Sequence, residues 1–371
     1  MNYSPLNKNV ILLLIHLILL TFTGCEQKSS VFFRYSPDQI LLTIESVSPN
    51  GEYAVINICD FSDTLSKMRR DYLILPVKTQ IILDIKEYNC WQSLDTTIFF
   101  EARNFTWSKG SKEMLFSCAL RQPKDTFELF PIYSYDLQSK TSSNLKKPWL
   151  NTPHFCIPLF SHKKNEIIFW APEVIIDTLP PSVTSFGRVF RWDTLQKSII
   201  EIIKNEDIAS ADWIGLYDTT DLFIQANDIL WWLSLSTDDI ENVLPDVQIV
   251  SKIRTFQNTI IFRGRSQGSD KIYVYDLEKK SPETILDYSK GAALSAVINN
   301  RHKLAVESIK DDHHWIFVVL KEGVVLDSLK GNSPFWLAGT DSLIYSEGKK
   351  IGLAYWQNKQ LKREIILEIV K

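Results

Sequence analysis

Few residues in this chain of 371 have the types and spacing that catalysis needs. Residues 264–268 (Gly-Arg-Ser-Gln-Gly) match the G-x-S-x-G pattern, in which a strained turn between a strand and a helix exposes a nucleophilic serine. Here strand-like apolar runs lie on both sides, at residues 259–262 and 272–277. The segment is therefore predicted to be a hairpin loop, with no catalytic role for Ser266.

Metal and cofactor chemistry also lacks a supporting pattern. His313 and His314 follow Asp311 and Asp312, but adjacent residues of an extended segment point to opposite sides and rarely ligate one ion. The sequence holds no His-x-x-x-His pair, no Cys-x-x-Cys pair and no glycine-rich phosphate loop. We predict no catalytic residue, no metal site and no cofactor.

Composition narrows the class of protein further. The formal net charge is -3, whereas nucleic-acid binding needs a basic surface that displaces counterions, so no nucleic-acid partner is expected. Hydrophobic residues make up 45% and aromatic residues 12% of the chain, which predicts a folded protein. The length allows two ordinary domains or one repeat array.

The first 24 residues have the pattern of an export signal. Lys8 precedes an apolar run over residues 10–20, which is too short to span a bilayer. Residues 21–25 (Thr-Phe-Thr-Gly-Cys) resemble a bacterial lipobox, which implies that Cys25 is acylated and becomes the new N-terminus. The expected anchor and a short tether at residues 25–31 place the protein in the bacterial envelope, with the outer membrane favoured. An ordinary secretory signal with an incidental cysteine is the alternative.

Four other cysteines raise the question of disulfides, which are common in exported proteins: Cys59, Cys90, Cys118 and Cys156. Cys59 and Cys118 each follow a turn glycine by eight residues, so they occupy equivalent positions of neighbouring repeats. Packed sheets are about 10 Å apart, and a disulfide needs Cα atoms within roughly 7 Å. Both are predicted to be small buried residues with no bond between them.

A β-strand pattern recurs along the chain and predicts a repeat fold. Residues 271–277 (Lys-Ile-Tyr-Val-Tyr-Asp-Leu) alternate in the manner of a strand with one buried face. Six versions of this strand follow the same form: residues 72–77, 132–137, 189–194, 230–235, 315–320 and 351–356. A final strand follows in several repeats, at residues 79–83, 198–202 and 364–369.

A second signal precedes each recurring strand: an apolar strand end, a polar turn and an apolar residue seven positions further on. The pairs are Val47 and Ala54, Trp107 and Met114, Phe160 and Ile167, Gly215 and Leu222, Ile253 and Ile260, Val297 and Leu304, and Trp336 and Leu343. Their spacing of roughly 40 to 60 residues suits four-stranded propeller blades with insertions in the first three. We predict an all-β fold, a single β-propeller over residues 32–371, with seven blades favoured over six. The strand near residues 39–43 is a candidate to pair into the last blade and close the ring.

These motifs resemble the repeats of a known family. The turn at residues 48–51 (Ser-Pro-Asn-Gly), its counterpart at 107–110 and strands of the form Ile-Tyr-x-Tyr-Asp-Leu are similar to those of TolB-type β-propellers, and the blades are WD-repeat-like. The resemblance covers nearly the whole mature chain and implies the propeller fold. A fold does not by itself define a function.

Two functions remain open. The favoured one is a lipid-anchored binding or scaffold module that presents one face to a protein or glycan partner. The alternative is a hydrolase or lyase at the mouth of the central channel, which would need titratable side chains that converge from several blades. The propeller half of a prolyl-peptidase-like enzyme is not expected, because only residues 370 and 371 follow the last predicted strand.

Loop lengths predict where a partner would bind. The spacing from second to third strand is 18, 18 and 22 residues in the first three repeats and 8 to 12 in the others. Because these loops emerge on one face, the insertions at residues 60–71, 120–131 and 172–188 should stand side by side. Two of them carry apolar residues that a solvated loop would not need, which are the candidate partner-binding residues: Phe127, Leu129, Phe130, Val174, Ile175, Ile176 and Phe186. Packing of the loops on one another is the alternative.

Overall fold

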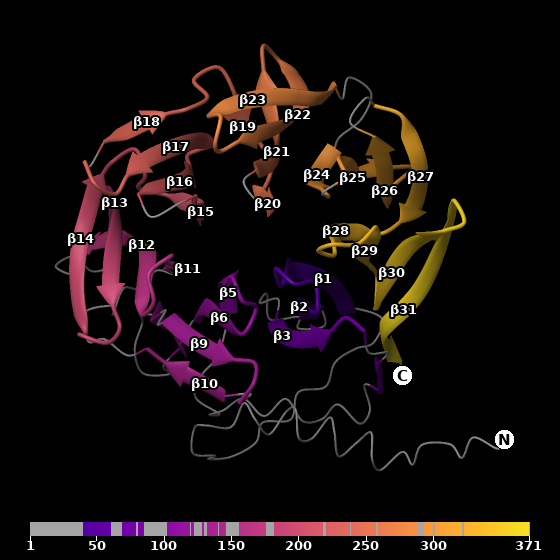
Figure 1. The fold of residues 1–371 in the computed structure, drawn as a ribbon, viewed down its shortest axis with the longest axis horizontal. Coiled ribbons are helices and arrows are strands. Elements are labelled where there is room, and N and C mark those ends of the chain that lie inside the picture. Colours follow the sequence, from indigo (N-terminus) through magenta and orange to yellow (C-terminus); the bar gives the residue numbers. More distant parts are fainter. Residues whose placement is uncertain are drawn as a thin grey trace.

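The computed structural model describes residues 40–60, 69–78, 81–84, 102–118, 120–121, 128–129, 132–139, 141–145, 156–175, 182–217, 220–237, 239–256, 259–287, 293–299, 301–320 and 323–370. The regular elements in these ranges are β-strands, and none of the described segments is a helix long and apolar enough to cross a membrane. Figure 1 looks along the short axis of a ring of small sheets. The predicted all-β propeller is therefore confirmed.

The first four blades follow the chain around the ring (Figure 1). Blade 1 contains β1 (Ile40–Val47), β2 (Tyr53–Asp60) and β3 (Arg69–Pro76). Blade 2 contains β5 (Ala102–Trp107), β6 (Glu113–Cys118), β9 (Ile132–Asp136) and β10 (Thr141–Asn144). Blade 3 contains β11 (Ile157–Phe160), β12 (Glu166–Ile175), β13 (Ser182–Asp193) and β14 (Ser198–Asn205). Blade 4 contains β15 (Ala211–Leu216), β16 (Asp221–Ala226), β17 (Ile229–Ser234) and β18 (Ile240–Asn242).

The remaining three blades complete the ring. Blade 5 contains β19 (Gln248–Ile249), β20 (Arg254–Phe256), β21 (Thr259–Ser266), β22 (Ser269–Asp276) and β23 (Ser281–Asp287). Blade 6 contains β24 (Ala293–Ile298), β25 (Lys303–Lys310), β26 (His313–Leu320) and β27 (Val325–Lys330). Blade 7 contains β28 (Asn332–Trp336), β29 (Ser342–Glu347), β30 (Lys350–Gln357) and β31 (Gln360–Val370). In each blade the first strand is innermost, and we call the face with the turns between first and second strands the turn face. The face with the loops between second and third strands is the insertion face.

Seven hydrophobic clusters among the described residues correspond to the seven contacts between neighbouring blades. The cluster between blades 7 and 1 joins Leu42 and Ile56 to Ile344 and Leu367, which are all at most 1% exposed. Each sheet is apolar on both faces, so only a closed ring buries all of this surface. The structure therefore has seven blades, the favoured count.

The strand near residues 39–43 was a candidate to pair into the last blade, but the ring closes in a different way. β1 does not enter the last blade but pairs with β2 as the innermost strand of blade 1, and the amide of Leu42 donates to the Gly348 carbonyl at 2.9 Å. The strand predicted at residues 79–83 is β4 (Ile81–Asp84), which lies parallel to the end of β31. It thereby covers an outer edge that would otherwise present unpaired backbone groups.

In four blades the two residues that stand seven positions apart in the sequence also pair across the first turn. Val47 is opposite Ala54, and the equivalent pairs form in blades 2, 3 and 7. In the other three blades the turn is shorter, so Gly215, Ile253 and Val297, which precede the second strand by the same spacing, are not directly opposite its first apolar residue. The residues that pair there are Leu216 with Leu222, Thr255 with Ile260 and Ile298 with Leu304.

The aspartate of the recurring strand has a local structural role. Asp276 accepts hydrogen bonds from the amides of Glu278 and Lys279 at 3.0 and 3.1 Å, which closes the turn into the fourth strand. Asp136 and Asp193 cap the same turn in blades 2 and 3. A side-chain oxygen that binds the following amides fixes such a turn, which is why the motif recurs.

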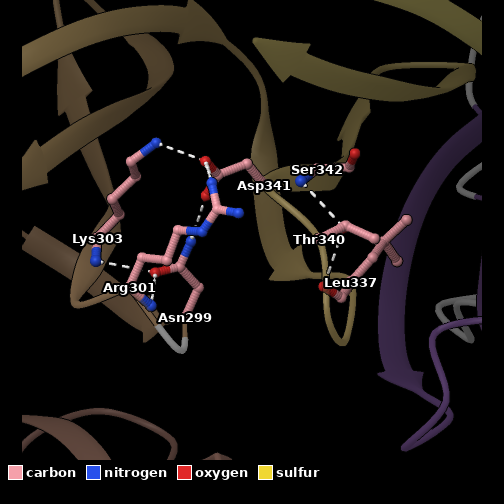
Figure 2. Close-up of polar contacts among 7 residues, drawn as sticks. All are labelled: Asn299, Arg301, Lys303, Leu337, Thr340, Asp341 and Ser342. Carbon is pink, nitrogen blue, oxygen red and sulfur yellow. Dashed lines mark hydrogen bonds and ion pairs between the residues drawn. The ribbon is translucent and has the colours of Figure 1, made fainter.

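Polar side chains connect neighbouring blades on the turn face. Figure 2 shows Asp341 of blade 7 in contact with three residues of blade 6. Its carboxylate accepts from Asn299 Nδ2 at 3.1 Å and Lys303 Nζ at 3.0 Å, and it also pairs with Arg301. The side-chain oxygen of Asn299 in turn accepts from two amides of its own turn. This network fixes the turn of blade 6 against blade 7.

Candidate functional site

The innermost strands are interrupted, and the interruptions bring polar residues to the propeller axis. β1 has a bulge between Ile44 and Ser46, so Glu45 is an extra residue of that strand. β15 has an equivalent irregularity at Asp212, and the inner edge of blade 5 is divided into β19 and β20. A bulge redirects a side chain and ends regular pairing, which is how such a strand can direct a charge inward.

A second polar pattern lies on the second strands. The residue three positions after the first apolar residue of each second strand is polar, charged or tryptophan: Asn57, Ser117, Trp170, Gln225, Arg263, Glu307 and Ser346. Trp170 donates to the Ile208 carbonyl at 2.9 Å, and Gln225 donates to a carbonyl of the interrupted strand of blade 5. These two side chains supply partners for backbone carbonyls that lie between strands and have no ladder bond.

Four charged residues from three blades form what we call the axial cluster: Glu45, Lys252, Arg254 and Glu307. Lys252 Nζ of blade 5 lies 3.7 Å from Glu45 Oε2 of blade 1. Blades 6 and 7 separate these two blades along the ring, so this ion pair reaches across the axis rather than between neighbours (Figure 1). Asn57 also donates to Glu45, at 3.2 Å.

Arg254 approaches the same region from β20. Its guanidinium lies over the ring of Phe335 of blade 7, with 4.3 Å between the guanidinium carbon and the ring centroid. Its Nε is buried, and among the described residues it has no hydrogen-bond partner. The charges of Glu45 and Glu307 act on it, but no described carboxylate forms a close ion pair with it.

Glu307 is the most enclosed acid of the axial cluster, with a side chain that is 11% exposed. It accepts from Ser295 Oγ at 2.9 Å and from the amide of Ser333 at 3.3 Å, and it contacts His314 Nδ1 at 3.0 Å. Three partners use most of the acceptor capacity of one carboxylate. This acid is therefore engaged in holding blades 6 and 7 together.

Burial dominates the electrostatics of the two cations. It lowers the pKa of Arg254, against the opposing charges of Glu45 and Glu307. Burial and the charge of Arg254 lower the pKa of Lys252, while Glu45 opposes this change. The Lys252 side chain is nonetheless 56% exposed, so solvent reaches it. Protein atoms surround Lys252 at the axis, but they do not form a dry core around it. The groups of the axial cluster that can still form hydrogen bonds are thus mainly the N–H donors of Lys252 and Arg254.

The predicted partner-binding residues lie on two insertions that the structure describes in part. Residues 120–121 and 128–129 form a small hairpin, β7 (Leu120–Arg121) and β8 (Glu128–Leu129), within the blade 2 insertion. In blade 3, β12 and β13 continue outward as a hairpin that pairs Val174 with Val183 and Ile175 with Ser182. Phe127, Phe130 and Ile176 lie outside the described residues, as do the side chains of Leu129, Val174 and Ile175.

Phe186 is the one candidate partner-binding residue whose side chain the structure describes. It is half-buried, and the Lys204 ammonium lies 4.9 Å from its ring centroid. Lys204 belongs to β14 of the same blade, so this contact tests neither partner binding nor the packing of the loops on one another. The other loops of this face are short as predicted, with two residues each in blades 4 to 7.

The other sequence candidates have structural roles or lie outside the described ranges. Ser266 ends β21 beside a two-residue hairpin turn, as expected for residues 264–268. His313 and His314 begin β26, and the described residues contain no group of three or more histidine, cysteine or acidic side chains that could hold a metal ion. Cys59 and Cys156 are buried thiols, as predicted for Cys59. Cys25, Cys90 and the side chain of Cys118 lie outside the described residues.

Sequence reasoning did not find the axial cluster. Its four charged members are scattered over blades 1, 5 and 6, and each resembles an ordinary strand or loop charge. One signal was present, because the polar position three residues into each second strand repeats with the blades and includes Glu307. Glu45, Lys252 and Arg254 lie in interrupted strands, whose irregularity no spacing rule predicts.

Comparison with known proteins supports the fold class. No protein-family model matches the sequence, and no curated protein matches it significantly. Among solved structures, a prolyl endopeptidase aligns over 95% of this chain and 52% of its own, with a TM-score of 0.56 and 10% identity. The β-propeller domain of the Trilobed protease from Pyrococcus furiosus, described as having an open velcro topology, aligns over 88% and 98%, with a TM-score of 0.52 and 12% identity. TolB from Acinetobacter baumannii aligns over 95% and 93%, with a TM-score of 0.43 and 13% identity.

These likenesses define a class of protein and nothing narrower. The chain is a seven-bladed β-propeller, which is the fold that the resemblance to TolB-type propellers implied. It spans about half the length of the prolyl endopeptidase that it matches. At this level of identity the similarity carries no activity from the neighbours to this chain.

Proposed function

We propose that this propeller is a lipid-anchored binding module of the bacterial envelope, which holds a protein or glycan partner on its insertion face. The observation that supports this most is that the insertions of blades 2 and 3 extend as β-hairpins from the same face of neighbouring blades. Hairpins that project from a rigid ring present side chains with little loss of entropy on binding. The lipobox-like residues 21–25 support the anchor and the envelope location, with the outer membrane favoured.

Catalysis at the channel mouth is the second candidate, and the axial cluster bears on it. An enzyme of that kind needs an acid or histidine whose lone pair or proton is available to a substrate. Glu307 has three partners, and Glu45 is held by Asn57 and Lys252. The two acids of the axial cluster are thus occupied by hydrogen bonds and an ion pair, whereas Lys252 and Arg254 still have N–H groups that can donate. This arrangement favours binding over catalysis.

Shortening the insertions tests the binding proposal. We expect that replacing residues 120–131 and 174–185, which include six of the seven candidate partner-binding residues, with two-residue turns leaves the propeller folded, because the second and third strands of both blades pair without these segments. Pull-downs from envelope extract should then lose specific partners of the full-length protein. As a matched control, the existing two-residue turn at Gln267 and Gly268 on the same face is replaced by Asn-Gly. A shortened protein that retains every partner would place the binding site elsewhere.

The anchor is tested separately through Cys25. A Cys25→Ala variant cannot be acylated at this position, so we expect an uncleaved or soluble form. Fractionation of cells after a salt wash measures the membrane-bound share, with the unsubstituted protein as reference. If the variant still partitions wholly with membranes, the anchor assignment is wrong, whatever the outcome of the partner experiment.

A further inference from the structure

The axial cluster contains a binding feature that the insertion face does not explain. Lys252 and Arg254 both leave the interrupted inner edge of blade 5, two residues apart, and reach groups on blades 1 and 7. A strand break that directs the buried Nε of Arg254 towards the axis is unfavourable for stability alone, because desolvation of a charged group opposes folding. Such an arrangement is typical of a site that has a further use.

Arg254 is held in one orientation. Phe335 covers one face of its guanidinium at 4.3 Å, and a stacked guanidinium keeps its plane and thus the direction of its donors. Five N–H donors are available to the group, and its buried Nε has no hydrogen-bond acceptor among the described residues. The buried Nε of Arg191 and several tryptophan Nε1 atoms also lack a hydrogen-bond partner among the described residues, so the unpaired Nε counts only together with the position of Arg254 at the axis beside Lys252.

The two acids nearby form no hydrogen bond with this Nε. Glu307 is engaged by Ser295, Ser333 and His314, and Glu45 by Asn57 and Lys252. The carboxylates of Glu45 and Glu307 do, however, limit the negative charge that a bound ligand can carry. Two carboxylates already offset the two cations, so a dianion would add more repulsion than a single charge. A planar carboxylate also matches the parallel donors of a guanidinium.

We propose that the propeller axis binds a singly charged carboxylate group, which Arg254 holds with paired N–H donors and Lys252 holds by its charge. The ligand is a small molecule or the end of a larger one, because inner strands surround the axis on all sides (Figure 1). Phe335 supports the guanidinium, and Glu45 positions Lys252. This site is separate from the insertion face and does not depend on the partner proposed there.

Titration with acetate tests the proposal on the whole protein. We expect saturable binding by calorimetry, and a shift of the Arg254 Nε–H signal in the nuclear magnetic resonance spectrum of isotope-labelled protein. Arg254→Gln should weaken acetate binding about tenfold or more, since a hydrogen bond to a charged group contributes about that factor. Lys252→Gln should weaken it less. Arg265→Gln is the matched control, because Arg265 pairs with Asp270 on the insertion face and should leave binding unchanged.

Several results would overturn the proposal. These are the absence of saturable acetate binding, or equal binding by the Arg254→Gln and Arg265→Gln variants. Tighter binding of inorganic phosphate than of acetate at neutral pH would refute the assignment of a singly charged ligand. If Arg254→Gln does not fold, two other measurements still test the site. Unchanged acetate affinity of the Lys252→Gln variant, together with an Arg254 Nε–H signal of the unsubstituted protein that acetate does not shift, would contradict the proposal.

Discussion

At the scale of single residues, the repeated motifs are capping devices. The Asp276 carboxylate accepts two amides of the turn that follows, and Ser234 takes its place in blade 4 with longer bonds of 3.4 and 3.3 Å. The amide of Lys279 is the main cause that lowers the pKa of Asp276, which agrees with a carboxylate stabilised in its ionised form. The motif that identified the fold therefore reports local turn chemistry, not a shared ligand.

We expect Asp276→Ala to destabilise the protein by about 1 kcal/mol, the usual value of such a hydrogen bond. Asp276→Asn should retain most of the stability, because its amide oxygen can accept the same bonds. The midpoint of urea unfolding measures both changes. Equal losses for the two variants would mean that the charge, and not the capping oxygen, is what matters at this turn.

At the scale of elements, contacts between turns lock neighbouring blades. Burial disfavours ionisation of Asp341, but hydrogen bonds and charges from Lys303 and Arg301 outweigh it and lower the pKa (Figure 2). A carboxyl with a lowered pKa in the folded state adds stability above its unfolded pKa and loses it as the pH falls through the folded pKa. The side chain of Arg301 is 63% exposed, so Lys303, at 18%, should contribute more.

Asp341→Asn should therefore lower the free energy of unfolding by about 1–2 kcal/mol at neutral pH and by progressively less in acid, as the pH falls below about 3.9, the pKa of an unperturbed aspartate. Denaturant unfolding of both proteins at the two pH values checks this. Asp312→Asn is the control, because Asp312 lies in an exposed turn with φ 57, a conformation that asparagine tolerates. A loss at Asp341 that does not change with pH would contradict the electrostatic explanation.

At the scale of the whole molecule, closure of the ring makes all blade contacts equivalent. Leu42 lies between blades 7 and 1, where the two ends of the repeat array meet, and Leu222 lies between blades 3 and 4. Both are 0% exposed. In a closed ring the two contacts bury the same kind of surface, although only the first joins distant parts of the sequence.

Leu42→Ala and Leu222→Ala should thus each cost about 2–5 kcal/mol and lower the unfolding midpoint to a similar extent. Leu326→Ala, at a position that is 44% exposed, should change it little. Urea unfolding followed by tryptophan fluorescence compares the three. A much smaller effect at Leu42 would show that the ring opens between its first and last blades in solution.

Features that depend on residues near one another along the chain could be predicted from the sequence. Alternating strands, the aspartate of each recurring strand and the short turns of blades 4 to 7 are local, so the fold class and the site of the insertions could be read directly. The tertiary structure decided what depends on distant parts of the chain. β4 joined β31 rather than blade 1, because an open edge of the last blade was available to it. Glu45 met Lys252 because bulges and closure of the ring brought them to one axis, and no spacing in a single sequence encodes that approach.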